Sequence, residues 1–390
     1  TASRTIIKVM STTVFAPRPT ITSFDLIKDI PVSGLVFPVC VGGTANNVLL
    51  PVPAGALPAG LKVEWIAGPD QPAVVIRGTP TELDAVGKKV SLGLFTDVYN
   101  IDTLDVHFTV SDIPPSSSIT AFAGYLTSTL DNTAAHAIRG DIKIDNDLNG
   151  PTGNITIRVA TQDTAAPIEF RSAVWSGYSP ATGNLVLDLV NDDTGARLLL
   201  YVALDGNVNG TYTSPLAIPY SIYATARSDI PAEYEGYYTV ALRELNEDDT
   251  YTFHGWLQVK VEATGVVTYQ GEMIDGAAIG PQTTYVTPSF NIDVEPGKKP
   301  YGDLIFFQPL YWSEELGKFS GRLAGRLVIF PNTEREGEDI NDAWISACYG
   351  NEVDNPIWEK SAHDHVYLDP CGTVFDSARS VAAQVAPDSE

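Results

Sequence analysis

Residues 255–271 read Gly-Trp-Leu-Gln-Val-Lys-Val-Glu-Ala-Thr-Gly-Val-Val-Thr-Tyr-Gln-Gly. Apolar and polar side chains alternate through this stretch, which is the pattern of a β-strand with one face buried and one face in solvent. Leu257, Val259 and Val261 are predicted to face a core, and the polar residues between them are predicted to face water. Short strands of this kind, separated by turn residues, recur along most of the chain. The sequence therefore predicts an all-β protein.

The composition limits the classes of function. The chain has 390 residues, of which 44% are hydrophobic, so it can form real cores and is not disordered in bulk. Asp and Glu number 48 against 24 Lys and Arg, and the formal net charge is −24. That charge repels phosphate backbones and anionic lipids, so the partners we expect exclude nucleic acid and membrane surfaces. No apolar stretch reaches the length of about 20 residues that a transmembrane helix needs, so we expect no transmembrane segment.

Two separated motifs suggest the fold of the N-terminal part. Short alternating strands occur at 25–112, with turns at the spacing of a β-sandwich. Residues 57–63 read Leu-Pro-Ala-Gly-Leu-Lys-Val, and residues 76–81 read Ile-Arg-Gly-Thr-Pro-Thr. This pair resembles the LPxGL and xGTPT motifs of Ig-like modules in bacterial surface proteins, and the resemblance implies an Ig-like β-sandwich. A Pro- and Ser-rich linker at 113–118 is predicted to end this domain.

The stretch 119–330 is predicted to be an internal duplication with halves at about 119–229 and 230–330. Gly124-Tyr-Leu is echoed by Gly236-Tyr-Tyr, and Gly153-Asn-Ile is echoed by Gly255-Trp-Leu. The alternative is chance similarity among Gly-rich strands. Each half is expected to form an antiparallel, barrel-like sheet or a pair of sheets, because closure removes the edges that would otherwise aggregate.

The pattern from Gly236 to Gly276 also resembles β-rich repeat modules in secreted proteins of the Verrucomicrobia–Planctomycetes kind. That resemblance implies no chemistry, but it agrees with a secreted or cell-surface bacterial protein. The chain begins at Thr1 without a Met or a basic and apolar leader, as a mature chain does after signal removal. We therefore expect an extracellular location.

The first strand suggests a mode of self-association. Thr5–Phe15 is rich in β-branched residues, and two prolines end it. It lacks a hairpin partner, so it either pairs at the edge of its own domain or is donated to a neighbouring subunit. The residues predicted to form this assembly strand are Ile6, Ile7, Val9, Val14 and Phe15. Residues 1–24 are thus treated as a strand and a Pro-rich spacer.

Residues 331–390 are an acidic C-terminal extension, with a helical turn expected at 339–348. Cys348 and Cys371 are expected to form a disulfide, as is usual in a secreted chain. The alternative is a zinc site made by the two cysteines with the His363-Asp-His365 pair. Cys40 stands in an apolar stretch and is expected to be a buried free thiol.

The sequence also contains one candidate ion site and one candidate binding face. Asp145, Asp147 and Asn149 precede Gly150 at alternate positions, as in the first part of a calcium loop, but the twelfth position is Thr156 and not Glu. The alternative is an Asx-rich hairpin turn, for which Asn149-Gly150 is sufficient explanation. No cofactor is expected apart from this Ca²⁺. Exposed aromatic side chains on a sheet can stack on sugar rings. The aromatic residues considered for such a glycan face are Tyr237, Tyr238, Trp256, Tyr311 and Trp312.

Motifs for nucleophilic, zinc-dependent, phosphate-binding and dinucleotide-binding enzymes are missing from the sequence. The first hypothesis is therefore a non-enzymatic extracellular structural protein, a subunit of a surface layer, fibre or appendage that assembles through the first strand. The second is an adhesin-like module that binds a glycan or a surface partner. A hydrolase with paired carboxylates is the third, because 48 acidic residues allow many pairs.

Overall fold

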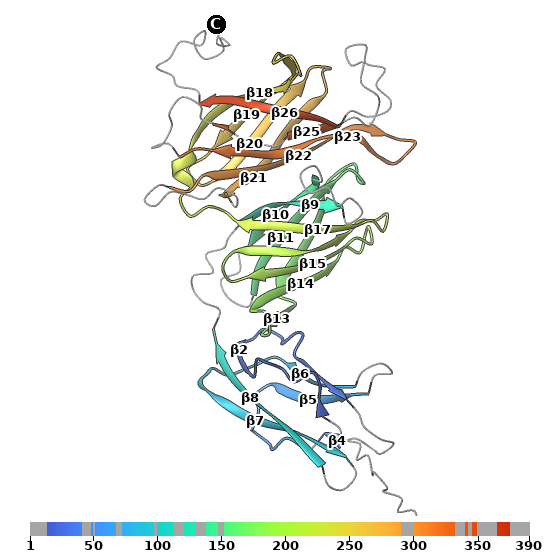
Figure 1. Ribbon diagram of the computed structural model, residues 1–390, viewed down its shortest axis with the longest axis vertical. Helices are drawn as coiled ribbons and strands as arrows, with labels where there is room; N and C mark the ends of the chain where they lie inside the picture. Colours follow the sequence, from blue (N-terminus) through green and yellow to red (C-terminus); the bar gives the residue numbers. More distant parts are fainter. Residues whose placement is uncertain are drawn as a thin grey trace, which may run out of the picture. The chain divides into compact units, whose positions relative to one another are not determined.

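The computed structural model describes a chain built almost entirely from β-strands. The described residues are 14–40, 48–49, 51–67, 72–96, 100–112, 121–128, 138–146, 152–289, 299–331, 340–341, 345–348 and 365–374. Apart from a short 3-10 helix at Pro231–Tyr234, their regular elements are strands, so the prediction of an all-β fold is confirmed (Figure 1). Within this part of the chain, no helix has the length and apolar character needed to cross a bilayer.

The N-terminal part is a β-sandwich of two four-stranded sheets, as the sequence predicted, but it also includes Val14–Phe15 and begins its next strand at Ser23, before the predicted start at residue 25. One sheet has the order β1 (Val14–Phe15), β3 (Val36–Cys40), β6 (Ala73–Gly78) and β5 (Leu61–Ile66). The other has the order β2 (Ser23–Ile27), β8 (Asn100–Ser111), β7 (Asp84–Thr96) and β4 (Val48–Leu49). Alternate residues of both sheets, including Phe24, Phe37 and Phe108, form one buried core.

The two sequence motifs of this domain meet in space. Gly60 and Gly78 both have positive φ angles, of 89° and 123°. A Cβ atom on Gly60 would lie 1.9 Å from the Thr79 carbonyl oxygen, and one on Gly78 would lie 2.1 Å from the Gly60 carbonyl oxygen. The Thr81 amide donates to the Ala59 carbonyl at 3.0 Å. Both glycines are therefore needed because two backbones touch where β5 and β6 pair.

The end of the first strand pairs within its own domain. Val14 lies opposite Cys40 and Phe15 lies opposite Val39, in an antiparallel pairing of β1 with β3. The Phe15 side chain is 2% exposed and belongs to the sandwich core. In this single chain, Val14 and Phe15 therefore pair at the edge of their own domain, which is the first of the two alternatives, and donation to a neighbouring subunit stays a prediction. The other predicted assembly residues, Ile6, Ile7 and Val9, lie outside the described residues.

A nine-stranded antiparallel sheet follows the sandwich. Its strands are β9 (Ala121–Ser128), β10 (Ile138–Asn146), β11 (Thr152–Thr161), β12 (Ile168–Val174), β13 (Gly177–Ser179), β14 (Asn184–Val190), β15 (Arg197–Ala203), β16 (Asn207–Thr213) and β17 (Pro219–Ala226). They are ordered β12-β11-β10-β9-β17-β16-β15-β14-β13. The first strand, β9, thus lies between the second strand and the last.

The second nine-stranded sheet closes on itself. Its strands are β18 (Gly236–Leu245), β19 (Tyr251–Val261), β20 (Val266–Met273), β21 (Ala278–Pro288), β22 (Gly302–Ser313), β23 (Lys318–Ile329), β24 (Ile340–Asn341), β25 (Ile345–Cys348) and β26 (His365–Val374). Each strand pairs with the next in the ring, and β26 returns to pair with β18. Because β24, β25 and β26 connect β23 to β18, neither β18 nor β23 is an unpaired edge strand. This closure fits the barrel-like sheet that the sequence predicted.

The described part of the C-terminal region belongs to the second large sheet. Strands β24, β25 and β26, which lie within the predicted acidic extension, are the strands that close it. The helical turn expected at 339–348 is wrong, since Ile340–Asn341 and Ile345–Cys348 are strands. Pairing with β23 and β26 gives these short segments hydrogen bonds that outweigh their weak helical pattern.

The two large sheets pair their first strand in the same way, but the glycines predicted to correspond do not all lie in equivalent strands. In each sheet the first strand pairs with both the second and the last, and the change of sheet between Ala226 and Gly236 falls at the predicted division. Gly124 and Gly236 both lie in first strands, β9 and β18. Gly153, however, lies in the third strand of its sheet and Gly255 in the second. The duplication stays a prediction, and its second pair of glycines does not match.

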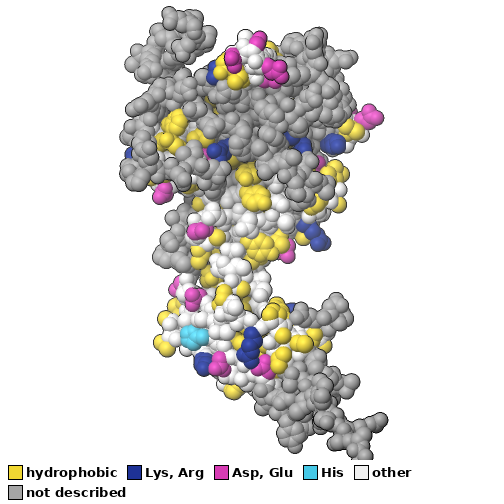
Figure 2. Space-filling model, viewed as in Figure 1, with side chains coloured by type: hydrophobic (Ala, Val, Ile, Leu, Met, Phe, Trp, Pro, Cys, Tyr) yellow, Lys and Arg dark blue, Asp and Glu magenta, His cyan; other side chains and the backbone are white. Residues whose placement is uncertain are grey.

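A small apolar layer joins the two sheets. Ile138 of the first sheet and Ile305, Phe307 and Ala324 of the second form one buried cluster. At its border the Gln162 side chain accepts a hydrogen bond from the Arg322 guanidinium at 3.1 Å and donates one to the Gly321 carbonyl at 3.1 Å. These contacts hold β10 and β11 against β22 and β23. On the face drawn in Figure 2, hydrophobic side chains of the described residues form small separate groups among polar ones.

Candidate functional site

A cavity of about 500 Å³ lies beside this apolar layer, between the two large sheets. Strands β10, β11 and β12 form one wall, and β21 and β22 form the other. The lining residues used below are Asp141, Lys143, Asp145, Arg158, Glu169, Gln282, Thr283, Tyr285 and Gln308. A cavity of this size with a few convergent polar groups is the common form of a small-molecule site in proteins.

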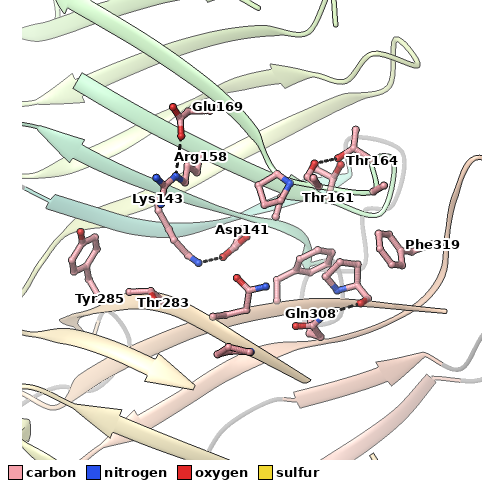
Figure 3. Close-up of a pocket in the computed structure, with 18 of the residues that line it drawn as sticks. Asp141, Lys143, Arg158, Thr161, Thr164, Glu169, Thr283, Tyr285, Gln308 and Phe319 are labelled. Atoms are coloured by element: carbon pink, nitrogen blue, oxygen red, sulfur yellow. Dashed lines mark hydrogen bonds and ion pairs between the residues drawn. The ribbon is translucent and has the colours of Figure 1, made fainter. Parts of the chain in front are cut away.

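Two ion pairs form the first wall (Figure 3). Lys143 on β10 lies directly opposite Arg158 on β11, so two positive charges are neighbours in the sheet. Asp141 lies 3.3 Å from the Lys143 ammonium, and Glu169 on β12 lies 3.1 Å from Arg158 Nε. Each cation is thus held by a carboxylate from its own strand or the next one. The wall presents donors and acceptors side by side.

Asp141 is the most deeply buried charged residue of this wall. It is 4% exposed, and burial raises the pKa of its carboxyl above the ordinary value, while the nearby Lys143 ammonium lowers that pKa only in part. The buried Tyr269 hydroxyl, which donates to the Phe307 carbonyl at 3.1 Å, has a raised pKa because of desolvation and the charge of Asp141. Asp141 therefore binds a proton more readily than an exposed aspartate.

The second wall is uncharged and carries hydroxyl and amide groups. The Tyr285 hydroxyl donates to Asp145 across the cavity, and burial together with that bond raises the pKa of the phenol. Gln308 accepts a hydrogen bond from the Gly280 amide at 3.0 Å and donates to the Pro309 carbonyl at 2.9 Å. Gln282 and Thr283 add further polar groups on β21. This wall suits a ligand that both donates and accepts hydrogen bonds.

Of the three residues predicted to bind calcium, the structure describes Asp145. Asp145 lies on β10, lines the cavity and accepts the hydrogen bond from Tyr285. Asp147 and Asn149 lie outside the described residues. Within the described ranges, no three His, Cys, Asp or Glu side chains cluster in a way that could hold a metal ion. The calcium site stays a prediction.

The cysteines differ from expectation. Cys40 is an exposed free thiol, so the prediction that it is buried is wrong: it ends β3, where alternation points it away from the core. Cys348 lies opposite His365, and Cys371 lies six residues further along β26, opposite Ala241. Six residues of strand span about 20 Å, whereas disulfide-bonded Cα atoms lie within about 7 Å. This register does not favour the predicted disulfide, which stays a prediction.

Three of the four residues of the alternative zinc site lie in described strands. His363 lies outside the described residues, and the backbone pairing brings His365 next to Cys348 but leaves Cys371 at a distance along the strand. This register therefore does not bring Cys371 close to Cys348 and His365, as a zinc site made by these residues would require.

The aromatic residues considered for glycan binding fall into two groups. Tyr238 is 1% exposed and belongs to the core of the closed sheet, where its hydroxyl donates to the Tyr234 carbonyl at 2.6 Å. Tyr311 is partly buried against the same core. Tyr237 and Trp312 are exposed, at 58% and 39%, and Trp256 is half-buried. Only this second group can offer ring faces to a ligand.

Lys143, Arg158 and Glu169 are cavity residues that the sequence analysis did not single out. A signal for some of them exists, because Asp141, Lys143 and Asp145 alternate with apolar residues in one strand and must share a face. Such a row is usually a solvated face. That it instead lines a cavity depends on β21 and β22, which come from about 140 residues further along the chain.

Comparison with known proteins adds no relative. No protein-family model, no curated protein and no solved structure matches this chain.

Proposed function

We propose that the chain is a non-enzymatic, extracellular binding protein that holds a glycan in the cavity between its two large sheets. The observation that carries the proposal is the composition of the cavity, where ion-paired carboxylates and cations face hydroxyl and amide groups. Sugar hydroxyls both donate and accept hydrogen bonds, so they suit a wall that alternates the two roles. The acidic, secreted-type composition supports an extracellular setting.

Binding is favoured over hydrolysis by the contacts of the cavity carboxylates. A glycosidase needs two carboxyl groups that act on one bond from positions about 5–10 Å apart, with one of them kept protonated. Asp141 has a raised pKa, but its close charged neighbour is the Lys143 ammonium. Glu169 has a lowered pKa, held down first by Arg171 and then by Arg158. Both carboxylates therefore serve to position cations.

The proposal is tested by a glycan array with the full chain, followed by calorimetric titration of the best uncharged oligosaccharide. Arg158 and Arg171 both contact Glu169, and both are exposed, but only Arg158 lines the cavity. Arg158→Ala is expected to weaken binding about tenfold, since it removes one charged donor, whereas Arg171→Ala should bind as the native chain does.

Equal binding by the two arginine variants, or an array without a bound glycan, contradicts the cavity as a glycan site. Release of shortened sugars during the titration, abolished by Asp141→Asn, would favour the hydrolase instead.

A second candidate function is a structural role through strand donation, in which Val14 and Phe15, paired in cis in the single chain, would pair with a neighbouring subunit instead. Its test is deletion of residues 1–13, which removes Ile6, Ile7 and Val9. Assembly of the full chain into polymers that the deletion abolishes would support a surface layer or fibre, and electron microscopy decides between the two roles.

A further inference from the structure

The outer face of β18, β19 and β20 carries an ordered strip of polar and aromatic side chains. Three cross-strand rows follow one another without a register shift. The rows are Tyr237–Lys260–Thr268, Thr239–Gln258–Gln270 and Ala241–Trp256–Glu272. Alternation places all nine side chains on the face opposite the core, which the residues between them fill.

The strip contains a depression, and several of its side chains are held in place by contacts with their neighbours. A depression of about 660 Å³ lies over the first two rows. The Lys260 ammonium lies 5.8 Å from the centre of the Tyr237 ring and 3.0 Å from Glu262. The Gln270 amide donates to the Gln258 side chain at 3.3 Å. Side chains that are held by their neighbours lose less conformational entropy when a ligand binds.

From this arrangement we infer that the strip is a second binding site, for an extended, uncharged polysaccharide chain. Tyr237 and Trp256 lie in the first and third rows, four residues apart along the strands, which is about 14 Å. Their rings can stack on the apolar faces of separate sugars, while the glutamines and threonines between them bind hydroxyl groups. The site is independent of the cavity, with which it shares no residue among those described.

Charge selects an uncharged chain over an acidic one. Lys260 is the cation of the three rows, and its charge is balanced by Glu262, while Glu272 adds a negative charge. The whole chain carries a formal charge of −24. An acidic polysaccharide would be repelled at every step of its approach.

The order of the side chains favours a polysaccharide over a protein partner. Protein interfaces concentrate aromatic anchors at the centre and polar groups at the rim. The strip has the reverse order, since Tyr237 and Trp256 lie in its outer rows and Gln258 and Gln270 lie in the middle row.

Affinity electrophoresis of the full chain tests the inference, in native gels that contain soluble β-glucan, xylan or glucomannan, with polygalacturonate as the acidic comparison. At least one uncharged polysaccharide should retard the native chain. Tyr237→Ala and Trp256→Ala are each expected to weaken that retardation about tenfold. Tyr251→Ala is the matched control, because Tyr251 is 49% exposed on the same strand pair but lies outside the three rows.

The outcomes separate this site from the cavity. Loss of retardation in Tyr237→Ala but not in Tyr251→Ala or Arg158→Ala supports the strip, whatever the array shows for the cavity. A melting temperature of Tyr237→Ala equal to that of the native chain confirms that this variant keeps the fold. If Tyr237→Ala does not fold, the retardation of Gln258→Ala is measured in its place. Retardation only by polygalacturonate, none by the uncharged chains, or dimerisation in sedimentation that Tyr237→Ala abolishes would overturn the inference.

Discussion

Two neighbouring tyrosines in the first large sheet differ in one hydrogen bond. Tyr212 and Tyr220 are both buried, with ring centres 5.9 Å apart. The Tyr220 hydroxyl donates to Asp163 at 2.5 Å, whereas the Tyr212 hydroxyl has no hydrogen-bond partner among the described residues. Burial of a hydroxyl without a partner costs free energy that the phenyl ring of phenylalanine avoids.

The pair gives a prediction with its own control. Tyr212→Phe is expected to raise the free energy of unfolding by about 1 kcal/mol, and Tyr220→Phe to lower it by about 2 kcal/mol, because the second change removes a bond to a carboxylate. Urea denaturation of the two variants measures both values. A loss of stability in Tyr212→Phe as large as in Tyr220→Phe would show that the first hydroxyl also has a partner.

Asp141 makes stability depend on pH. Because burial raises its pKa in the folded chain above the ordinary value of 3.8, the folded state holds the proton in a pH range where the unfolded state has released it. Stability from this group is therefore present at low pH and is lost as the pH rises from about 4 through the raised pKa. Asp141→Asn removes the titration.

The measurement is chemical denaturation of the native chain and of Asp141→Asn at pH 4 and pH 7. The variant should gain stability relative to the native chain between pH 4 and pH 7, since the native carboxylate becomes charged while buried. The opposite trend would mean that the Lys143 ammonium outweighs burial and lowers the pKa of Asp141.

At the scale of elements, the contact between the two motifs of the sandwich is the sharpest requirement. Gly60→Ala would place a methyl group 1.9 Å from the Thr79 carbonyl oxygen at a positive φ angle, so one of two paired strands must move. Gly55 also has a positive φ, of 77°, but a Cβ atom there meets nothing within 4 Å. The same substitution at the two sites thus separates backbone strain from steric contact.

Gly60→Ala is expected to cost at least about 3 kcal/mol, and Gly55→Ala about 1–2 kcal/mol. Thermal unfolding followed by circular dichroism gives both values. Equal losses at the two sites would show that the β5 and β6 backbones can separate without breaking the core.

At the scale of the whole molecule, closure of the second large sheet predicts that its C-terminal strands are indispensable. A chain that ends at Phe330 lacks β24, β25 and β26, which leaves β18 and β23 as open edges. Open edges with apolar interiors aggregate or unfold. Calorimetry of the truncated chain should lose the unfolding transition of the second large sheet and keep that of the β-sandwich. Two unchanged transitions would mean that the closing strands add no stability.

Much of the fold follows from local patterns in the sequence. Leu257, Val259 and Val261 are all 1% exposed or less, as their alternation with polar residues requires. The glycines of the sandwich motifs occupy positive φ angles, and the change of sheet near residue 230 falls where the pattern restarts. Such features depend on neighbours within a few residues, because the period of two and the freedom of glycine are properties of the chain itself.

Alternation in the sequence by itself determined the all-β class and the apolar side of strands such as 257–261, although it missed the strands within 339–348. Only the tertiary structure decided which strands lie together. Backbone hydrogen bonds between strands are nearly the same for every sequence, so alternation does not name the partner. For this reason β26 closes on β18 more than 100 residues earlier, Val14 and Phe15 pair with β3, and Asp145 meets Tyr285. The cavity exists because two sheets bring their polar rows together, and no segment of the chain contains it.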